Sequence, residues 1–368
     1  MKVHFITKHQ LTDQSSRLRV GQYLPHLRRA GLEFGVSCFY GPALQSVVYT
    51  RGNYARKVLY TGWSVLRRFA EIPRVSRNDI VFIHREVVPF FFTTIERLYR
   101  SAGCRIVYDC DDAIFLDIPS RYNPAVRWLR NPRKVHRLMT LADHLVVGNR
   151  NLAEYARPYN EAITVIPTPV DLSFYRRRAT TDGQPRVATI GWMGSRFSSY
   201  YLKCLEPVFR RLLKRYPGLR LKLVDVEDFM TDEPRATLKR WSLAEELEDL
   251  HSFDIGVMPL FDDGIARYKS AFKLLQYMAV GLPVVCNPIG MNAEVVQDGE
   301  NGFWATSEEE WFSRLSLLIE QPALRARMGA AGRETVERDY SVEVNCARLL
   351  RTFEEVRRGP RGGRSARP

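Results

Sequence analysis

Short runs of β-branched and other apolar residues alternate along the chain with longer segments whose apolar residues recur at helical spacing. In the first half these runs predict strands over residues 3–6, 35–39, 80–84, 106–108, 144–147 and 163–166. In the second half they predict strands over residues 187–190, 221–224, 255–258 and 284–286. This alternation is typical of βα units and predicts parallel sheets covered by helices, an α/β fold.

The intervening segments predict helices. Leu18, Leu24 and Leu27 recur at near-helical spacing over residues 17–29, and Gly31 follows as a stop, so we expect the first crossover helix there. Further helices are expected over residues 201–216, 270–280, 308–319 and 342–356. No fixed-period repeat occurs, which argues against a solenoid.

The chain is expected to contain two domains. Its 368 residues exceed the ~250 to 300 at which a single core stops growing. Pro167 and Pro169 end the first alternating series, and a polar linker follows, so the boundary is placed near residue 180. We expect domains over 1–180 and 181–340, a terminal helix over 341–356 that packs back on the first domain, and a disordered basic tail over 357–368. Two such Rossmann-like, doubly wound domains face a cleft, and ligands bind at the carboxyl ends of their strands.

Charge is unevenly distributed. The chain has a net charge of +14; residues 1–175 contain 25 Lys and Arg against 14 Asp and Glu, whereas residues 176–356 contain 25 against 27. This asymmetry points to nucleic acid, an acidic membrane surface or an anionic substrate as a partner. No apolar run reaches the ~18 to 20 residues of a membrane span, and no signal peptide precedes the first strand, so we expect a cytoplasmic protein. The six cysteines form no CxxC pair and are expected to be reduced and buried.

Two segments of the second domain favour phosphate binding. After the strand over 187–190, Gly191 and Gly194 would let backbone N–H groups approach a phosphate, with Ser195 and Arg196 beside them. Farther along, Ser270 is expected to cap a helix, with Lys269 before it and Lys273 on its first turn. Free N–H groups, the helix dipole and two ammonium groups together favour a pyrophosphate. Gln276, one turn deeper, could bind a ribose; alternatively, this is a solvated helix with surface lysines.

The second segment carries a resemblance to a known family. The run from Lys273 to Val285, followed by Gly290 to Glu294 and Asp298 to Gly302, resembles the donor-binding half of retaining glycosyltransferases of the GT-B fold, group 1 or family 4. The resemblance covers residues 140–356. It implies a nucleoside-diphosphate sugar as donor substrate, no resident cofactor and no metal. It also implies that Phe272, Asp262 and Glu294 belong to the donor site.

The chain departs from this family at two positions. The family carries two glutamates eight residues apart where this chain has Tyr268 and Gln276. Gln276 can still bind ribose hydroxyls, but Tyr268 cannot replace a carboxylate. Either donor binding is rearranged, with Lys269, Asp262 or Asp263 taking part, or activity is impaired.

The first domain offers candidate acceptor-side residues. Asp109, Asp111 and Asp112 follow a strand; such a cluster is a metal-nucleotide motif in another glycosyltransferase fold, but here we expect contacts to acceptor hydroxyls or a helix cap. Arg17 is also assigned to the acceptor side. His84 and Arg85 follow another strand, where the family often places a basic residue near the reacting sugar.

The resulting hypothesis is a retaining transfer of a sugar to an acceptor hydroxyl, with charge on the leaving diphosphate stabilised mainly by Lys273, Lys269 and Arg196. The acceptor is expected to be a glycan or lipid-linked glycan. The basic first half would then bind this acceptor or dock on an anionic membrane surface, at the inner face of the cell membrane. The alternatives are a nucleotide-sugar epimerase, an inactive donor-binding protein and, disfavoured by the absence of RNP-like or zinc-finger patterns, a nucleic-acid-binding protein.

Overall fold

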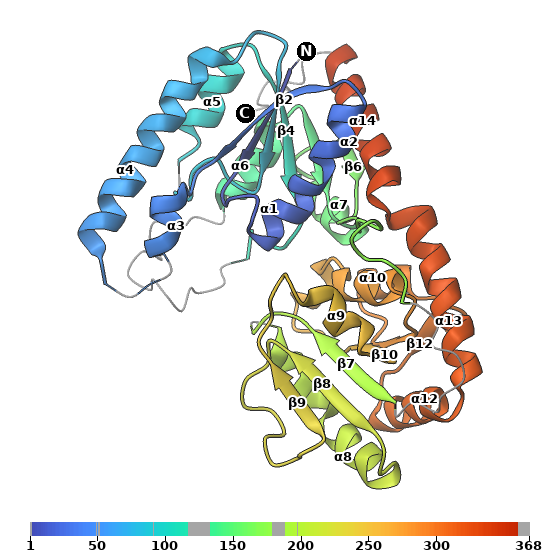
Figure 1. The fold of residues 1–368 in the computed structure, drawn as a ribbon. Helices are drawn as coiled ribbons and strands as arrows, with labels where there is room; N and C mark the ends of the chain where they lie inside the picture. The colour runs from blue at the N-terminus through green and yellow to red at the C-terminus, as the bar shows by residue number, and fades with distance from the viewer. Residues whose placement is uncertain are drawn as a thin grey trace. The chain divides into compact units, whose positions relative to one another are not determined.

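The computed structural model describes residues 2–48, 50, 52–90, 92–116, 133–178, 188–196 and 198–359. The chain divides into two compact units: unit 1 consists of Met1–Pro169 with Val342–Pro368, and unit 2 of Val170–Ser341 (Figure 1). The division falls at Pro169, inside the proline-rich segment. Residue 180, near which the sequence places the boundary, and residues 360–368 of the expected tail lie outside the described residues.

Unit 1 is built on one parallel sheet of six strands in the order β2-β1-β3-β4-β5-β6. The strands are β1 (Lys2–Thr7), β2 (Glu33–Cys38), β3 (Ile80–His84), β4 (Arg105–Cys110), β5 (His144–Val147) and β6 (Ile163–Val165). The helices are α1 (Gln14–Arg19), α2 (Leu24–Arg29), α3 (Pro42–Val48), α4 (Tyr54–Glu71), α5 (Thr94–Ser101), α6 (Arg133–Leu141), α7 (Arg150–Ala156) and α14 (Val342–Arg358).

The last helix, α14, belongs to the core of unit 1. Its buried residues include Val342, Leu349 and Phe353, which share one apolar cluster with Phe5 and Phe82 of the sheet. The ring of Phe353 lies 6.2 Å from that of Phe5 and 6.0 Å from that of Phe82. The prediction that the terminal helix packs on the first domain is therefore confirmed.

The single helix predicted over residues 17–29 is wrong. The chain instead forms α1, a 3₁₀ turn over Gly21–Tyr23, and α2. Val20, with φ −128° and ψ −55°, interrupts the helix, and Pro25 stands in the first turn of α2. A proline is favourable at such a position because a backbone N–H in the first turn of a helix would have no acceptor within the helix, so proline loses no hydrogen bond there.

Unit 2 has a second parallel sheet of six strands, in the order β12-β11-β10-β7-β8-β9. The strands are β7 (Thr189–Met193), β8 (Arg220–Val224), β9 (Ala236–Lys239), β10 (Ile255–Met258), β11 (Val284–Cys286) and β12 (Gly302–Trp304). The helices are α8 (Glu206–Arg215), α9 (Glu246–His251), α10 (Phe272–Ala279), α11 (Met291–Val295), α12 (Glu308–Glu320) and α13 (Pro322–Thr335). The pattern did not predict the edge strands β9 and β12 or the helix α13. Two doubly wound parallel sheets confirm the predicted fold class.

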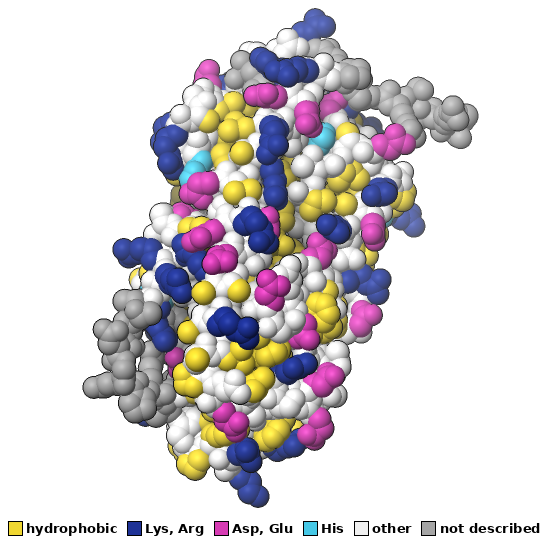
Figure 2. Space-filling model, turned by 90° about the vertical axis from the view of Figure 1, so that its right-hand side faces the viewer, with side chains coloured by type: hydrophobic (Ala, Val, Ile, Leu, Met, Phe, Trp, Pro, Cys, Tyr) yellow, Lys and Arg dark blue, Asp and Glu magenta, His cyan; other side chains and the backbone are white. Residues whose placement is uncertain are grey.

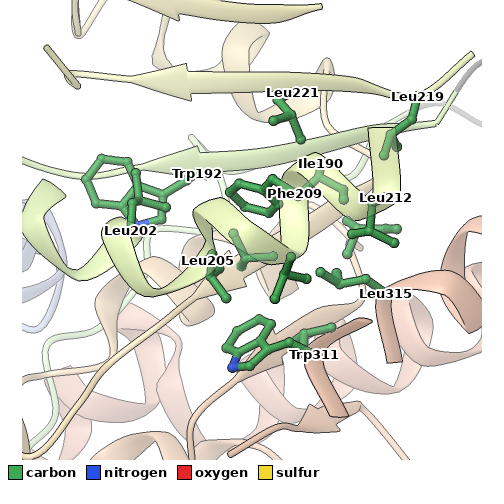
Figure 3. Packing of buried hydrophobic residues seen from close by; sticks show 14 of the residues in the cluster. Ile190, Trp192, Leu202, Leu205, Phe209, Leu212, Leu219, Leu221, Trp311 and Leu315 are labelled. Carbon is green, nitrogen blue, oxygen red and sulfur yellow. The ribbon is translucent and has the colours of Figure 1, made fainter. Parts of the chain in front are cut away.

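A large apolar cluster of unit 2 forms where α8 and α12 pack against the sheet (Figure 3). Phe209 and Leu212 of α8 lie between Ile190 of β7 and Trp311 of α12, and all four are at most 3% exposed. Trp192 closes the end of this cluster nearest the carboxyl end of β7. The site described below therefore stands on a rigid, well-packed strand.

Two further expectations concern the chain as a whole. Among the six cysteines, all free thiols, four are buried as expected, whereas Cys38 is half-buried and Cys204 is exposed. Within the described part of the chain, no helix combines the length and hydrophobicity needed to cross a membrane.

Candidate functional site

The carboxyl end of β7 and the start of α10 are fixed to each other in unit 2. The backbone N–H of Met193, the last residue of β7, donates to the Tyr277 hydroxyl of α10 at 2.8 Å. Gly256 of β10 makes room for the Tyr277 ring, since a Cβ at Gly256 would lie 2.4 Å from the ring atom Cδ2. This packing sets the N-terminus of α10 beside the loop that follows β7.

The helix starts and ends through backbone geometry. Ala271, with φ +49°, precedes α10, so the predicted cap at Ser270 is wrong: the left-handed turn at Ala271 leaves Ser270 outside the helix, half-buried. At the other end Gly281 has φ +86°, its N–H donates to Met278, and that of Leu282 donates to Tyr277. This is a Schellman motif, which glycine favours.

Lys273 is the central cation of this region. Its Nζ lies 5.4 Å from the centroid of the Trp192 ring, and it makes no hydrogen bond or ion pair with the described residues. Burial, with a smaller contribution from the charge of Lys269, lowers the pKa of Lys273 to about 7. An unpaired cation in such a place is costly unless an anion binds beside it.

Gly194 makes this arrangement possible. A Cβ at Gly194 would lie 2.5 Å from Lys273 Cε and 2.4 Å from Trp192 Cη2. Only a glycine lets the loop backbone pass this close to the lysine stem. By contrast, Gly191 lies inside β7, and its missing side chain makes room for the Phe253 ring, 2.0 Å from a Cβ there. Gly191 therefore contributes to the packing of β7 beneath the loop.

The second lysine, Lys269, lies over an aromatic ring. Its Nζ is 5.2 Å from the centroid of the Tyr201 ring. Tyr200 and Tyr201 both donate through their hydroxyls to Asp263. Burial alone would raise the pKa of Asp263, but these hydrogen bonds and two backbone N–H donors lower it to about 2. Asp263 thus remains ionised and holds the Tyr201 ring under Lys269.

Other predicted donor residues lie around this core, with varied surroundings. Exposed Arg196 pairs with Asp225 at 3.6 Å and Glu227 at 2.8 Å. The backbone N–H of the neighbouring Ser195 donates to the hydroxyl of Ser198 at 3.2 Å. The remaining three are Asp262, which is exposed and 3.5 Å from Arg267; Phe272, buried at the start of α10; and Glu294, exposed on α11.

Gln276 belongs to a buried polar network. Its amide nitrogen donates to the Tyr175 hydroxyl at 3.0 Å and to Glu246 Oε1 at 3.1 Å. Tyr175 also donates to Glu246, and Trp241 Nε1 donates to Glu246 Oε2 at 2.7 Å. Sequence reasoning missed Tyr175 and Glu246, because they stand 101 and 30 residues from Gln276 and no local pattern connects them.

In unit 1, His84 at the end of β3 is held in a chain of buried groups. His84 Nδ1 lies 2.7 Å from Asp109 Oδ2, and His84 Nε2 lies 2.9 Å from the Ser15 hydroxyl. Arg19 donates to both oxygens of Asp109 and, at 2.7 Å, to the carbonyl of Ile166. Asp109 accepts rather than donates when ionised, so the neutral imidazole carries its proton on Nδ1 and accepts from Ser15.

The other first-domain candidates are arranged around β4. Asp109 and Cys110 are part of β4 rather than following it, and Asp109 is fully buried. Arg85 donates to Asp111 at 2.8 Å and 3.1 Å; burial opposes the charge of Arg85, but Asp111 raises its pKa. The side chain of Asp112 is half exposed, and Arg17 is half-buried on α1.

No group of three or more His, Cys, Asp and Glu side chains in the described residues is arranged to hold a metal ion.

Among the predicted site residues, the structure brings together Lys273, Lys269 and Gly194 in unit 2, and His84 and Asp109 in unit 1.

Comparison with known proteins agrees with this geometry. Residues 270–335, which contain α10 and α11, match the family model "Glycosyl transferases group 1". A trehalose synthase from Pyrococcus horikoshii is 23% identical over 159 residues, which is 39% of this chain and 38% of that protein. The chain thus matches about two fifths of this curated relative's length.

Solved structures match over nearly the whole chain. Sucrose-phosphate synthase from Thermosynechococcus elongatus aligns with a TM-score of 0.69 and 13% identity, covering 96% of this chain and 98% of that one. Anabaena HepE in complex with UDP-glucose aligns with a TM-score of 0.62 and 14% identity, covering 96% and 100%. The fold is that of the GT-B glycosyltransferases. Its segment from Ser270 to Thr335 is the one that the group 1 model describes.

Proposed function

We propose that this protein is a glycosyltransferase that moves a sugar from a nucleoside diphosphate to an acceptor hydroxyl, with retention at the anomeric carbon and without a metal. The observation that carries the proposal is Lys273, a cation with no anionic partner among the described residues, which lies at the N-terminus of α10 beside a second lysine and a glycine loop. The group 1 match over the same helix supports it.

In this proposal the diphosphate lies between the loop at Gly194 and the first turn of α10. The free N–H groups of that turn and the ammonium of Lys273 stabilise the charge that develops on the leaving diphosphate. Lys269 adds a second positive charge. Gln276 and Glu246 supply the polar groups nearest the ribose, with Glu294, Asp262, Phe272, Ser195 and Ser270 lining the rest of the donor site.

Unit 1 takes the acceptor in this proposal. His84 is the group best suited to handle the acceptor proton, because Asp109 orients the imidazole and leaves Nε2 as an acceptor directed at a hydroxyl, that of Ser15. Arg85, Asp111, Asp112 and Arg17 would contact the acceptor around it. The acceptor class we propose is a glycan or lipid-linked glycan, and its binding accounts for the positive charge of the first half.

Two measurements test the proposal. In a thermal-shift panel, one among UDP-, GDP- and ADP-sugars should raise the melting temperature, by an amount that grows with ligand occupancy. With that donor, free nucleoside diphosphate should appear only when an acceptor is added, and EDTA should not stop its release. Diphosphate release or sugar isomerisation without acceptor would indicate the epimerase instead, and donor binding without turnover would indicate an inactive protein.

Donor binding should be accompanied by proton uptake. At pH 8 most of Lys273, whose pKa is about 7, is neutral in the free protein, whereas a bound diphosphate favours the charged form. We therefore expect close to one proton to be taken up per nucleoside diphosphate bound at pH 8, and little at pH 6. Calorimetry in buffers of different ionisation enthalpy measures this number.

The matched control for proton uptake is the Lys273→Met variant. Its residual binding should show no uptake beyond that of the phosphate itself. Equal uptake by both proteins would contradict the assignment of the proton to Lys273.

A further inference from the structure

Helix α4, residues Tyr54–Glu71, exposes an unusual amount of apolar surface. The described residues contain eleven exposed large hydrophobic side chains, and six of them lie on this one helix. The five most exposed, at 64% to 73%, are Tyr54, Val58, Leu59, Trp63 and Leu66, and Phe69 is the sixth. A monomeric protein rarely leaves such a contiguous patch without a partner.

The helix is amphipathic with its apolar half turned outward. At 3.6 residues per turn, the exposed apolar residues fill one half of the circumference, together with Ala55, Gly62 and Ala70. The other half is polar, and it contains the helix's two buried residues, Ser64 and Arg68. An ordinary surface helix buries its apolar stripe against the core, so α4 has the reverse orientation.

A buried arginine fixes this orientation. Arg68 is fully buried and donates to the carbonyl of Thr7 at 2.9 Å and to the Ser37 hydroxyl at 2.6 Å. It also pairs with Glu71 at 3.0 Å. Rotating the helix to hide its apolar half would break all three interactions. Figure 1 shows α4 at one side of unit 1, next to α3, with which it packs.

The surroundings of α4 are strongly positive. No Asp or Glu occurs in the sequence between Glu33 and Glu71, and residues 53–77 contain six Lys and Arg against Glu71 alone. Glu71 is already paired with Arg68, whereas Arg56 and Arg74 are exposed. By contrast, on the face that Figure 2 shows, Lys and Arg side chains are interspersed with Asp and Glu.

We propose that α4 is the element by which this protein docks on an anionic lipid surface, lying in the plane of the membrane with its apolar half among the acyl chains. Trp63, Leu59 and Leu66 enter the boundary between headgroups and chains, and Arg56 and Arg74 contact lipid phosphates. A second copy is a poorer occupant, because two such faces would bring like charges together. The proposal deepens the proposed function, and rests on it only for the lipid-linked acceptor.

Vesicle sedimentation of the whole protein, without any sugar donor, tests this docking. The wild-type chain should bind vesicles of phosphatidylglycerol and phosphatidylcholine, and bind pure phosphatidylcholine far less. The double substitution Trp63→Ser and Leu66→Ser should lower the partition coefficient at least about tenfold, since two large apolar side chains lose their burial. The matched control is Leu243→Ser, an exposed leucine of unit 2, which should bind as the wild type does.

Three results would overturn the proposal: no binding of the wild type to anionic vesicles, unchanged binding by the double variant, or a dimer in solution that the double substitution dissociates. The melting temperature of the double variant, measured without donor and compared with that of the wild type, checks that the variant is folded. Because docking is measured without donor, failure here leaves the proposed transfer untouched, and failure of donor binding leaves docking untouched.

Discussion

Replacing Lys273 by alanine should lower the turnover number by about 10² to 10³, because removal of one preorganised charge donor has this effect in a site that stabilises a leaving anion. Lys273 is well suited to this part: it lies at the N-terminus of α10, with its ammonium over Trp192 and no anion among the described residues to neutralise it. Turnover is measured as release of nucleoside diphosphate in the presence of acceptor.

Stability distinguishes this role from a structural one. Burial lowers the pKa of Lys273 from 10.5 to about 7, so between these values the unfolded chain binds a proton that the native chain does not. The depressed pKa therefore lowers the free energy of unfolding. This loss has its full size below pH 7 and disappears as the pH rises toward 10.5. Lys273→Ala should melt at the same temperature as the wild type or higher at pH 7, while it loses activity.

The control for this experiment is Lys214→Ala on α8. Lys214 is exposed on α8 and is assigned to no proposed binding site, so the turnover and the melting temperature of Lys214→Ala should match those of the wild type. A Lys273→Ala variant with turnover within threefold of the wild type would contradict the assignment of the leaving-group charge to Lys273.

Local patterns of apolar and polar residues in the sequence predicted much of the fold. The strands over 80–84, 144–147, 255–258 and 284–286 match the structure residue for residue, because buried parallel strands are continuous apolar runs bounded by turns. The edge strands β9 and β12 were missed because they are only four and three residues long, and because β9 is half-polar. The helix over 17–29 was overextended because periodicity records which residues face the core, and it does not register the break at Val20.

The candidate site likewise contains residues that the sequence predicted and residues that it missed. Lys273, Lys269 and Gly194 could be found because a strand end and a helix start place them in one loop cluster. Glu246 could not, because its contact with Gln276 depends on tertiary packing of α9. This contact bears on the departure from the family pattern: where that family has a glutamate at position 276, this chain has Gln276 bonded to a carboxylate from another helix.

The second large effect is expected in unit 1, where Asp109→Asn should destabilise the protein by about 3 to 5 kcal/mol, as is typical when one partner of a buried ion pair is removed. Asp109 is fully buried, Arg19 is 2% exposed, and Asp109 accepts from both Arg19 and His84. Asparagine keeps the shape but removes the charge, which leaves the guanidinium of Arg19 uncompensated. The unfolding midpoint in urea, followed by circular dichroism, measures the loss.

Two further variants separate charge from shape. Asp112→Asn changes a half-exposed carboxylate on the same segment and should stay within about 0.5 kcal/mol of the wild type, the usual range for surface substitutions. The double variant Arg19→Met and Asp109→Leu removes both charges and should recover most of the stability that Asp109→Asn loses, because no buried ion is left unpaired. If the double variant were as unstable as Asp109→Asn, the interaction with His84, rather than the ion pair, would be the main contribution of Asp109.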